Sequence, residues 1–494
     1  MASRPLLLSL AVVVLVTAAR LTGTVDSDVA WQLWIADRIH DGANLYRDIV
    51  ETNPPLWFWM ALPIDRIAGL THLRIESVLI VAIGCVGALS LSTTSLFLRH
   101  LAPRQRSLFL SAATIMLCAM PWMHVGQREQ IVMIGSLPYA ALIAARREGR
   151  PISPWLTVGI AIGAALGFAL KHYFLVVPLV LELWLLAGLG RKWRPVRPET
   201  LAVAVVGAAY AGAMLLFEPD FLTRIVPLLG LAYGAFGAPS AAYLFGPFAL
   251  VGTLLVAVLA LHARHLATGR EAPLASALAV SAFGFAAAYF IQFKGWTYHA
   301  IPMTGFSSMA IVALLAESSA PLRPLRLAAP ALLSLPLFLA AEEQLHPTLP
   351  NPDLIDAVSG LQRGDTVGFL TTETAIPWSV TLQGGYVYPS RYNGFWMMRA
   401  ILRDEQKPRH DPRLIQLGRQ IIAETVSDFS CTPPKRIIVS RPRPGEPSFD
   451  ILPFFLRSPD FAALLSHYRA TSRTSLEVYE LATPLPAHSC SRVS

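Results

Sequence analysis

Two carboxylates, Asp26 and Asp28, stand directly after the first apolar segment of the chain. Apolar residues then recur at helical spacing, at Trp31, Trp34, Ile35 and Ile39, until Gly42. This pattern predicts an amphipathic helix at a membrane surface. Asp28 would lie at the helix N-terminus, where exposed N–H groups and the helix dipole favour the ionised carboxylate. An ionised carboxylate can take a proton from a hydroxyl group, so Asp28 is the candidate general base and Asp26 a second candidate catalytic residue.

Further ionisable side chains lie later in the same polar stretch and in other polar stretches between the apolar segments. These residues are Asp48, Glu51, Arg128, Glu129, Lys171, His172, Lys294, Tyr298 and His299. Glu129 is a third candidate catalytic carboxylate. The others are candidates for binding a substrate. Cations among them, at Arg128, Lys171, Lys294 and His299, could stabilise negative charge that develops on a departing group.

Each candidate also has a purely structural interpretation. The two acids of the first outer loop could simply be solvated at the end of a span. Arg128 and Glu129 could form a local ion pair or cap a helix. Lys171 could extend to the lipid headgroups. Lys294 and His299 flank Trp and Tyr residues, which are common at membrane surfaces in any case.

The composition identifies the kind of protein that carries these residues. The chain has 494 residues, of which 54% are hydrophobic and only 15% charged, whereas a soluble protein has about 25% charged residues. Its mean hydropathy is +0.50. These values exclude a disordered protein, a disulfide scaffold and a single soluble domain. We therefore expect a polytopic α-helical membrane protein.

Apolar runs of sufficient length predict about eleven transmembrane helices. They lie near 5–21, 75–98, 107–124, 130–145, 154–170, 173–189, 200–217, 241–261, 274–291, 301–316 and 325–341. The apolar stretch Leu56–Leu70 is interrupted by Pro63, Asp65 and Arg66, which favours a helix lying in or near the membrane interface. The first segment could be a cleaved signal peptide, but an uncleaved anchor agrees better with the distribution of charge.

The distribution of the net charge of +8 along the chain predicts which side of the membrane each loop occupies. Residues 342–494 hold 16 basic and 16 acidic residues, so the whole excess lies in residues 1–341. With the N-terminus inside, the inner segments hold 15 basic and four acidic residues, and the outer ones nine and eleven. This arrangement obeys the positive-inside rule. An odd number of spans would place residues 342–494 outside the cytoplasm.

The predicted domains are a transmembrane domain over residues 1–341 and a small extracytoplasmic α/β domain over residues 342–494. Short strands are predicted at Thr366–Thr372, Arg436–Val439 and Leu476–Leu481, and helices at Asp353–Leu361 and Pro412–Asp428. Two of the four cysteines, Cys85 and Cys118, fall in apolar segments. Cys431 and Cys490 fall in the outer domain, where they could form a disulfide or pack separately.

Together these features resemble the GT-C glycosyltransferases, in particular the group of the protein O-mannosyltransferases and lipid A aminoarabinose transferases. The matching positions are Asp26-Ser27-Asp28, Trp31, Gly42, Tyr46, Pro54-Pro55-Leu56, Gln127-Arg128-Glu129, Lys294-Gly295-Trp296 and Tyr298-His299-Ala300-Ile301-Pro302. The resemblance covers about residues 1–341. Many relatives have adjacent Asp-Glu, whereas Ser27 separates the two acids here, so which acid is the base stays open. Asp26 could instead bind the acceptor, a metal ion or the partner acid.

The resemblance implies transfer of a sugar from a polyprenyl-phosphate donor to an acceptor hydroxyl on the outer face of a bacterial-type inner membrane. The acceptor would be a glycan, a lipid or a protein, and the anomeric carbon would be inverted. Some relatives use a divalent metal ion, so a metal cofactor is left open. The partners implied are the lipid-linked donor, the acceptor and the bilayer, without nucleic acid. The chain has no phosphate-binding P-loop or Rossmann fingerprint for a nucleotide.

Two other classes of protein remain as alternatives. A transporter or flippase of lipid-linked glycan would often show two related halves and charges near the bilayer midplane. This chain shows no clear repeat, and its charges gather at one predicted surface. A non-catalytic scaffold whose outer domain binds a cell-wall polymer is the third interpretation. Loss of activity on changing one outer carboxylate would argue against both.

Overall fold

The fold is described from a computed structural model that covers residues 4–236, 239–267, 272–317, 322–345, 352–441, 450–473 and 475–486. Tertiary contacts divide the chain into two compact units. Unit 1 comprises Met1–Val25, Ile67–Ala213 and Ala238–Pro347. Unit 2 comprises Asp26–Arg66, Met214–Gly237 and Thr348–Ser494. The C-terminal segment thus folds with two segments from the first part of the chain, which the sequence had assigned to a transmembrane domain over 1–341.

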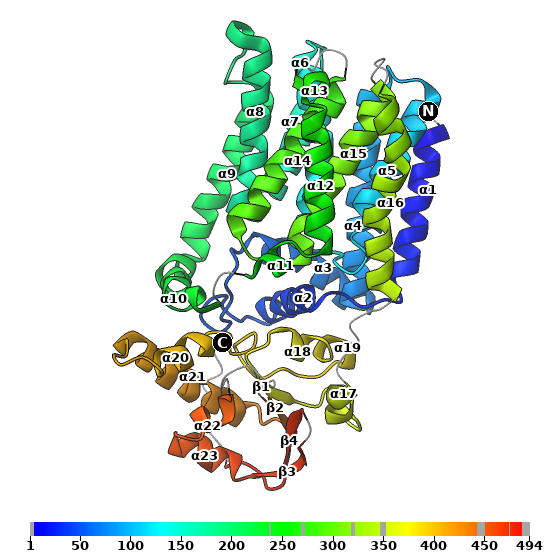
Figure 1. The fold of residues 1–494 in the computed structure, drawn as a ribbon. Coiled ribbons are helices and arrows are strands. Elements are labelled where there is room, and N and C mark those ends of the chain that lie inside the picture. The colour runs from blue at the N-terminus through cyan, green and yellow to red at the C-terminus, as the bar shows by residue number, and fades with distance from the viewer. Residues whose placement is uncertain are drawn as a thin grey trace. The chain divides into compact units, whose positions relative to one another are not determined.

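Unit 1 is a bundle of long helices (Figure 1). They are α1 (Arg4–Arg20), α4 (Ile75–Ser95), α5 (Pro103–Thr114), α6 (Arg128–Arg147), α7 (Pro154–Ala169), α8 (Val176–Leu189), α9 (Pro198–Phe217), α12 (Pro247–Leu261), α14 (Pro273–Gln292), α15 (Ile301–Glu317) and α16 (Arg323–Leu345). Shorter elements are α11 (Ala241–Leu244), α13 (Ala263–Ala267), the 3-10 turns η1 (Leu96–Leu98), η3 (His172–Leu175), η4 (Gly190–Lys192) and η7 (Thr297–Ala300), and the π-helical turn η2 (Ile115–Ala119). Each predicted apolar segment is therefore largely helical, although the helix ends at Ala119 within 107–124 and is interrupted at Phe245-Gly246 within 241–261.

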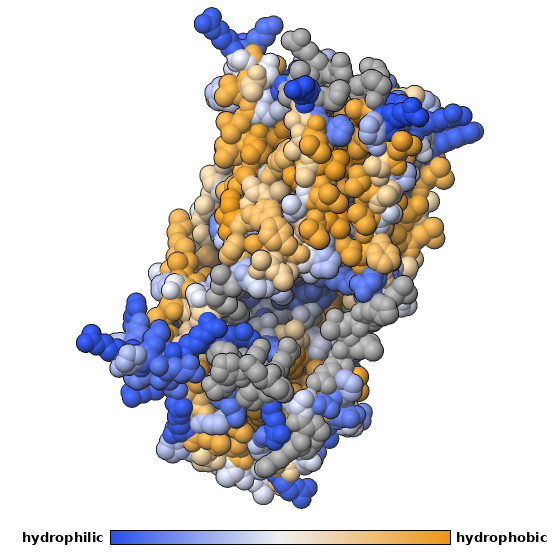
Figure 2. Space-filling model, viewed as in Figure 1, coloured by the Kyte–Doolittle hydropathy of each residue, from blue (hydrophilic) through white to orange (hydrophobic). Residues whose placement is uncertain are grey.

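Six helices in the described part of the chain are long and apolar enough to cross a membrane. They span Ile75–Leu98, His172–Lys192, Pro198–Phe217, Pro273–Gln292, Thr297–Glu317 and Arg323–Gln344. Three shorter apolar helices lie at Pro154–Ala169, Phe221–Ala235 and Pro247–Leu261. Figure 2 shows apolar surface along the helical bundle, as expected for helices that face lipid. The protein is thus a multi-pass membrane protein, and the number of eleven spans stays a prediction.

The centre of unit 1 is formed by α14 and α15, which pack against each other and against α6, α8 and α12. Along the apolar window of α15, 94% of the residues are buried, against none along α9. Small residues on α15 allow this close packing, as in many membrane helices. At Gly305 an added Cβ would lie only 2.6 Å from Met133 Sδ of α6. These packed helices provide a rigid support for the residues at their ends.

Unit 2 contains α2 (Ser27–His40), most of α3 (Leu56–Thr71), the π-helical turn η5 (Phe221–Ile225), α10 (Val226–Ala232), η6 (Tyr233–Phe236) and the C-terminal segment. The predicted amphipathic helix is confirmed as α2, and Gly42 follows its end with a φ of +95°. The predicted interfacial segment is the continuous helix α3, with Pro63 inside it.

A four-stranded sheet with the order β1-β2-β4-β3 forms the centre of the C-terminal segment. The strands are β1 (Val367–Leu370), β2 (Arg436–Ser440), β3 (Tyr468–Arg473) and β4 (Leu476–Leu481). β1 and β2 are parallel, and β4 is antiparallel to both β2 and β3. The helices are α17 (Pro352–Val358), α18 (Ala375–Trp378), α19 (Thr381–Gly384), α20 (Met398–Asp404), α21 (Pro412–Cys431), α22 (Ile451–Phe455) and α23 (Pro459–Leu465). The predicted small α/β domain is confirmed.

The sequence did not predict β3. Its residues are mostly polar and lack a clear apolar alternation, and its pairing with β4 is irregular between Ala470 and Ser472. Of the cysteines, Cys85 and Cys118 are free thiols and Cys431 is disulfide-bonded. Cys490 lies outside the described residues.

Candidate functional site

The N-terminus of α6 places two of the predicted residues, Arg128 and Glu129, in one helical turn. The preceding loop turns at Gly126, whose φ is +85°. Gln130 fixes this loop, because its side chain accepts a hydrogen bond from Gly126 N (2.9 Å) and donates one to Leu117 O (3.0 Å). Arg128 is 3% exposed and Glu129 is fully buried. The first turn of α6 therefore holds a cation and an anion away from solvent.

Glu129 is part of a buried triad with Lys171 and His299. Lys171 Nζ lies 2.6 Å from Glu129 Oε1 and 3.0 Å from His299 Nε2. Glu129 Oε1 and His299 Nε2 are 3.5 Å apart. Lys171 comes from the break between α7 and η3, and His299 from η7. Three separate breaks between helices thus bring their polar residues together within unit 1.

The triad fixes the direction of its hydrogen bonds. An ammonium group has only donors, so Lys171 donates to His299 Nε2, and the neutral ring then carries its proton on Nδ1. Among the described residues, His299 Nδ1 is buried without a hydrogen-bond partner, as are Nε and Nη1 of Arg128 and Oε2 of Glu129. Arg128 also interacts electrostatically with His299. Unsatisfied buried donors are costly, and they commonly mark a place where a ligand binds.

Three further predicted residues lie in the same loops of unit 1. Lys171 Nζ is 5.5 Å from the centroid of the buried Tyr298 ring. Lys294 interacts electrostatically with His299, and burial lowers the pKa of its ammonium group. His172 is exposed and stacks on Tyr173, with 3.9 Å between ring centroids. The structure therefore joins Tyr298 and Lys294 to the triad, whereas His172 interacts with Lys171 only electrostatically and packs its ring on Tyr173.

The two candidate acids of α2 belong to unit 2. Asp26 is the N-cap of α2, and its Oδ1 accepts a hydrogen bond from Asp28 N at 2.8 Å. Asp28 lies in the first turn of the helix. Both are partly exposed. The capping bond engages the Asp26 carboxylate with the backbone N–H of Asp28 in the first turn of the helix.

Asp48 and Glu51 have local partners in unit 2 that fix the loop after α2. Asp48 Oδ2 accepts hydrogen bonds from Asn44 N and Nδ2, at 2.8 and 3.1 Å. Glu51 is 3% exposed; its Oε2 accepts from Trp31 Nε1, and its Oε1 accepts from Asn53 N and Nδ2 at 2.7 and 2.6 Å. Both carboxylates therefore stabilise this loop.

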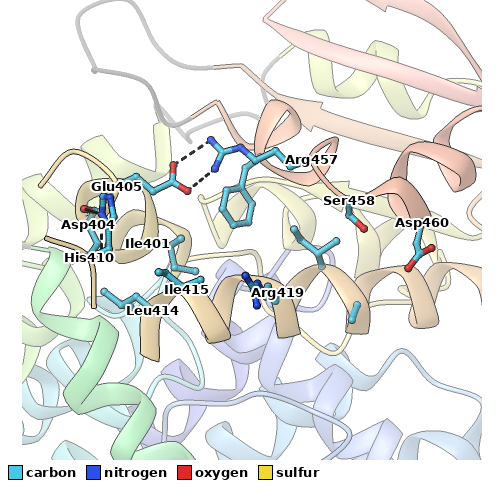
Figure 3. Close-up of a pocket in the computed structure, with 13 residues that line it drawn as sticks. Ile401, Asp404, Glu405, His410, Leu414, Ile415, Arg419, Arg457, Ser458 and Asp460 are labelled. Atoms are coloured by element: carbon cyan, nitrogen blue, oxygen red, sulfur yellow. Dashed lines mark hydrogen bonds and ion pairs between the residues drawn. The ribbon is translucent and has the colours of Figure 1, made fainter. Parts of the chain in front are cut away.

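A cleft of about 550 Å³ in the C-terminal part of unit 2 contains none of the predicted site residues. Figure 3 shows Glu405 and Arg457 joined by two hydrogen bonds at 2.6 and 3.2 Å, with Arg419 on α21 nearby. Ile401, Leu414 and Phe454 are among its apolar lining residues. Nothing in the sequence indicated it, because its residues come from α20, α21, α22 and the segment leading into α23.

We found no group of three or more His, Cys, Asp and Glu side chains among the described residues that could hold a metal ion. In unit 1, the ammonium group of Lys171 contacts both Glu129 and His299 at the positions that a metal ion would need. The residues of the triad therefore do not fit a divalent cation in this arrangement.

No family model and no curated protein matches the chain. Among solved structures, ArnT from Cupriavidus metallidurans bound to undecaprenyl phosphate matches with a TM-score of 0.54 at 14% identity, over 97% of this chain and 99% of that one. ArnT in the apo state gives a TM-score of 0.53 at 13% identity, with the same coverage. AglB from Archaeoglobus fulgidus, in complex with an inhibitory peptide and a dolichol-phosphate, gives 0.46 at 11% identity, over 96% and 74%.

The comparison with ArnT shows the fold of the chain. It is a membrane protein with the GT-C fold, as the resemblance of its motifs predicted. It shares this fold with ArnT over nearly its full length.

Proposed function

We propose that this protein is a membrane glycosyltransferase that moves a sugar from a polyprenyl-phosphate donor to an acceptor hydroxyl. The observation that carries the proposal is the set of unsatisfied donors in unit 1. Arg128 is 3% exposed, yet Nε and Nη1 lack partners, and His299 Nδ1 lacks one as well. An anion with several acceptor oxygens would satisfy all three, and the N-terminus of α6 adds a favourable dipole. A phosphate has this chemistry.

The similarity of fold supports a lipid-linked phosphate as this anion. The ArnT structure that matches this chain is bound to undecaprenyl phosphate. The apolar surface of the helices in unit 1 suits the tail of such a lipid. A free phosphate or a soluble sugar phosphate would gain nothing from that surface, whereas a polyprenyl tail would lie in the bilayer beside the helices.

In the proposed reaction, the acceptor oxygen attacks the anomeric carbon of the donor sugar, and the bond from this carbon to the phosphate oxygen breaks. Asp28 takes the proton of the attacking hydroxyl as general base. The leaving polyprenyl phosphate takes the electron pair, and its charge is stabilised by Arg128, Lys171, Lys294 and the N–H of His299. Attack opposite the leaving group inverts the anomeric carbon. Glu129 holds Lys171 in place, and Tyr298 packs against it.

We also propose that the site faces the outer side of a bacterial inner membrane, with residues 342–494 in the periplasm. The charge distribution of the loops supports this orientation. Lys407→Cys and Arg104→Cys, in a background of Cys85→Ser and Cys118→Ser, would test it with a membrane-impermeant maleimide. We expect labelling of Lys407→Cys in spheroplasts, and of Arg104→Cys only after permeabilisation. The opposite pattern would overturn the orientation.

The function is tested with the purified full-length protein in lipid nanodiscs and a panel of polyprenyl-phosphate sugars. We expect release of free polyprenyl phosphate, detected by mass spectrometry, from at least one donor in the presence of a lipid, glycan or peptide acceptor. Arg128→Gln should abolish release, whereas Arg150→Gln, at a partly exposed ion pair with Glu148, should not. A donor that binds and crosses the bilayer without cleavage would instead identify a flippase, and a panel in which no donor is bound or cleaved would reject both.

A further inference from the structure

The helix that carries Asp28 is packed against residues of the C-terminal segment within unit 2. Trp31, one turn after Asp28, stacks on Trp34 with 4.8 Å between ring centroids and 16° between planes. Trp378, at the end of α18, lies against both, with centroid distances of 5.0 and 5.5 Å. Trp31 and Trp378 are 2% and 1% exposed. One indole from the C-terminal segment thus contacts two indoles of α2.

Tyr388 links this aromatic cluster to the sheet. Its ring lies 4.9 Å from Trp378 and 6.3 Å from Phe369 of β1, centroid to centroid. Its hydroxyl donates to Tyr392 O at 2.7 Å. Tyr388 is buried and has both ends of its side chain engaged. Tyr388 therefore fixes the indole of Trp378 relative to the sheet, and Trp378 in turn limits the movement of α2.

A second connection runs through the loop after α2. Trp31 Nε1 donates to Glu51, and the neighbouring Val50 N donates to Arg391 O at 2.8 Å. Val50 also forms a parallel β-bridge with Tyr392. The Arg391 guanidinium is in turn bound to Asp428 of α21, with Nη2 to Oδ1 at 2.7 Å. The backbone of the loop is thus joined, through Arg391, to α21 of the C-terminal segment.

We infer that the C-terminal segment is a positioning element for the base, and that Trp378 is the positioning residue through which it acts on Asp28. The inference rests on the proposed function, since it concerns the same carboxylate. Trp31 is fixed on two sides, by Trp378 and by Glu51, and Asp28 lies three residues earlier on the same helix. Aromatic pairs of this kind stabilise a contact beyond the area that they bury. These contacts hold α2, and with it Asp28, in one orientation. A displacement of a catalytic group by about 1 Å can cost about 10²-fold in rate.

Trp378→Leu is the main test, with Trp378→Phe as the conservative variant and Trp155→Leu, at an exposed tryptophan of α7, as the control. We expect kcat of Trp378→Leu to fall by roughly 10- to 100-fold with the KM for the donor within about twofold of wild type, because the donor-binding residues lie in unit 1. Trp378→Phe should restore most of the rate, and Trp155→Leu should behave as wild type. Unchanged kcat in Trp378→Leu, or a loss that appears mainly in KM, would contradict the inference.

A second readout does not depend on activity. Ser27→Cys reports the first turn of α2, and Thr425→Cys reports the buried core of α21, each in the background of Cys85→Ser and Cys118→Ser. With Trp378→Leu added, we expect maleimide to label Ser27→Cys at least about fivefold faster while Thr425→Cys stays protected. Equal labelling with and without Trp378, or an equal rise at both positions, would overturn the inference. If no donor is ever cleaved, the proposed function fails, while the labelling still reports whether Trp378 positions α2.

Discussion

Lys171 Nζ lies 2.6 Å from Glu129 Oε1 in a part of unit 1 where Glu129 is fully buried and the lysine side chain is only 11% exposed. The ammonium group also contacts His299 Nε2, so one cation satisfies an acid and an imidazole at once. Removing one partner of a buried ion pair leaves an uncompensated charge, at a cost of about 3–5 kcal/mol. Lys171 therefore stabilises the buried Glu129 and also contributes positive charge to the proposed phosphate site.

Lys171→Met and Lys294→Met should consequently differ in their effects. Both remove a cation proposed to contact the phosphate, so both should weaken donor binding or slow transfer. Lys171→Met should also lower the thermal stability of the purified protein, because Glu129 loses its partner. Lys294 is only partly buried, so Lys294→Met should leave stability near wild type. Lys192→Met, at an exposed site, is the control. Full activity in both variants would return the two lysines to a structural role at the headgroups.

The sequence predicted the residues of this triad but not their pairing. Their types and their positions between apolar segments, on one predicted side of the membrane, indicated Glu129, Lys171 and His299. Lys171 and Glu129 are 42 residues apart, and Lys171 and His299 are 128 apart. No local pattern encodes such a contact, since it depends on how the helices pack.

The dependence on tertiary contacts also explains why the sequence could not separate the roles of the acids in unit 2. Asp28, Asp48 and Glu51 all carry a carboxylate and lie in one polar stretch, so all three were predicted from the sequence as site residues. Only the structure shows that Asp48 caps a turn and that Glu51 binds Trp31 and Asn53. The joining of residues 26–66 with the C-terminal segment also depends on tertiary contacts, such as Trp31 with Trp378.

Glu199 forms ion pairs with two arginines in unit 1, so we expect its substitution to lower the free energy of unfolding strongly. Glu199 is fully buried; it accepts from Arg197 Nε at 2.7 Å and from Arg146 Nη2 at 3.1 Å. Glu199→Gln would remove the carboxylate partner of Arg146 and leave Arg197 with Glu182, at a cost of about 3–5 kcal/mol for breaking a buried ion pair. Chemical denaturation in detergent should detect this loss. Glu148→Gln, at a partly exposed pair with Arg150, should cost less than about 1 kcal/mol. Similar losses in the two variants would disprove the network's role.

Glu218, which follows α9, predicts a pH-dependent stability. Burial is the main cause that raises its pKa from 4.5 to about 7; a hydrogen bond from Trp59 opposes this shift, and the nearby Asp220 adds a smaller increase. The folded protein therefore holds this proton more tightly than the unfolded chain. The contribution of Glu218 is most favourable below pH 4.5 and is lost as the pH rises towards 7, because the unfolded carboxyl ionises first.

Glu218→Gln should accordingly raise the melting temperature at pH 8 and have little effect at pH 5. Since the side chain of Glu218 is partly exposed, screening by solvent reduces the size of the gain. Thermal unfolding of the purified variant and wild type at both values of pH measures it. Asp460→Asn, at an exposed acid, should give no such difference. A gain of equal size at pH 5 and pH 8 would show that shape rather than charge is responsible.

The last prediction distinguishes Asp28 from Asp26 as the general base. Asp26 Oδ1 accepts a hydrogen bond from Asp28 N as the helix cap, and Asn caps a helix about as well as Asp. Asp26→Asn should therefore keep both the fold and much of the rate, whereas Asp28→Asn removes a carboxylate that the cap does not use. Loss of a general base typically costs about 10²–10⁴-fold in rate, so transfer should nearly vanish in Asp28→Asn while expression and donor binding persist. Single-turnover assays with saturating donor measure the chemical step directly. An inactive Asp26→Asn beside a fully active Asp28→Asn would reverse the two roles, and near wild-type rates in both would exclude this loop from the chemistry.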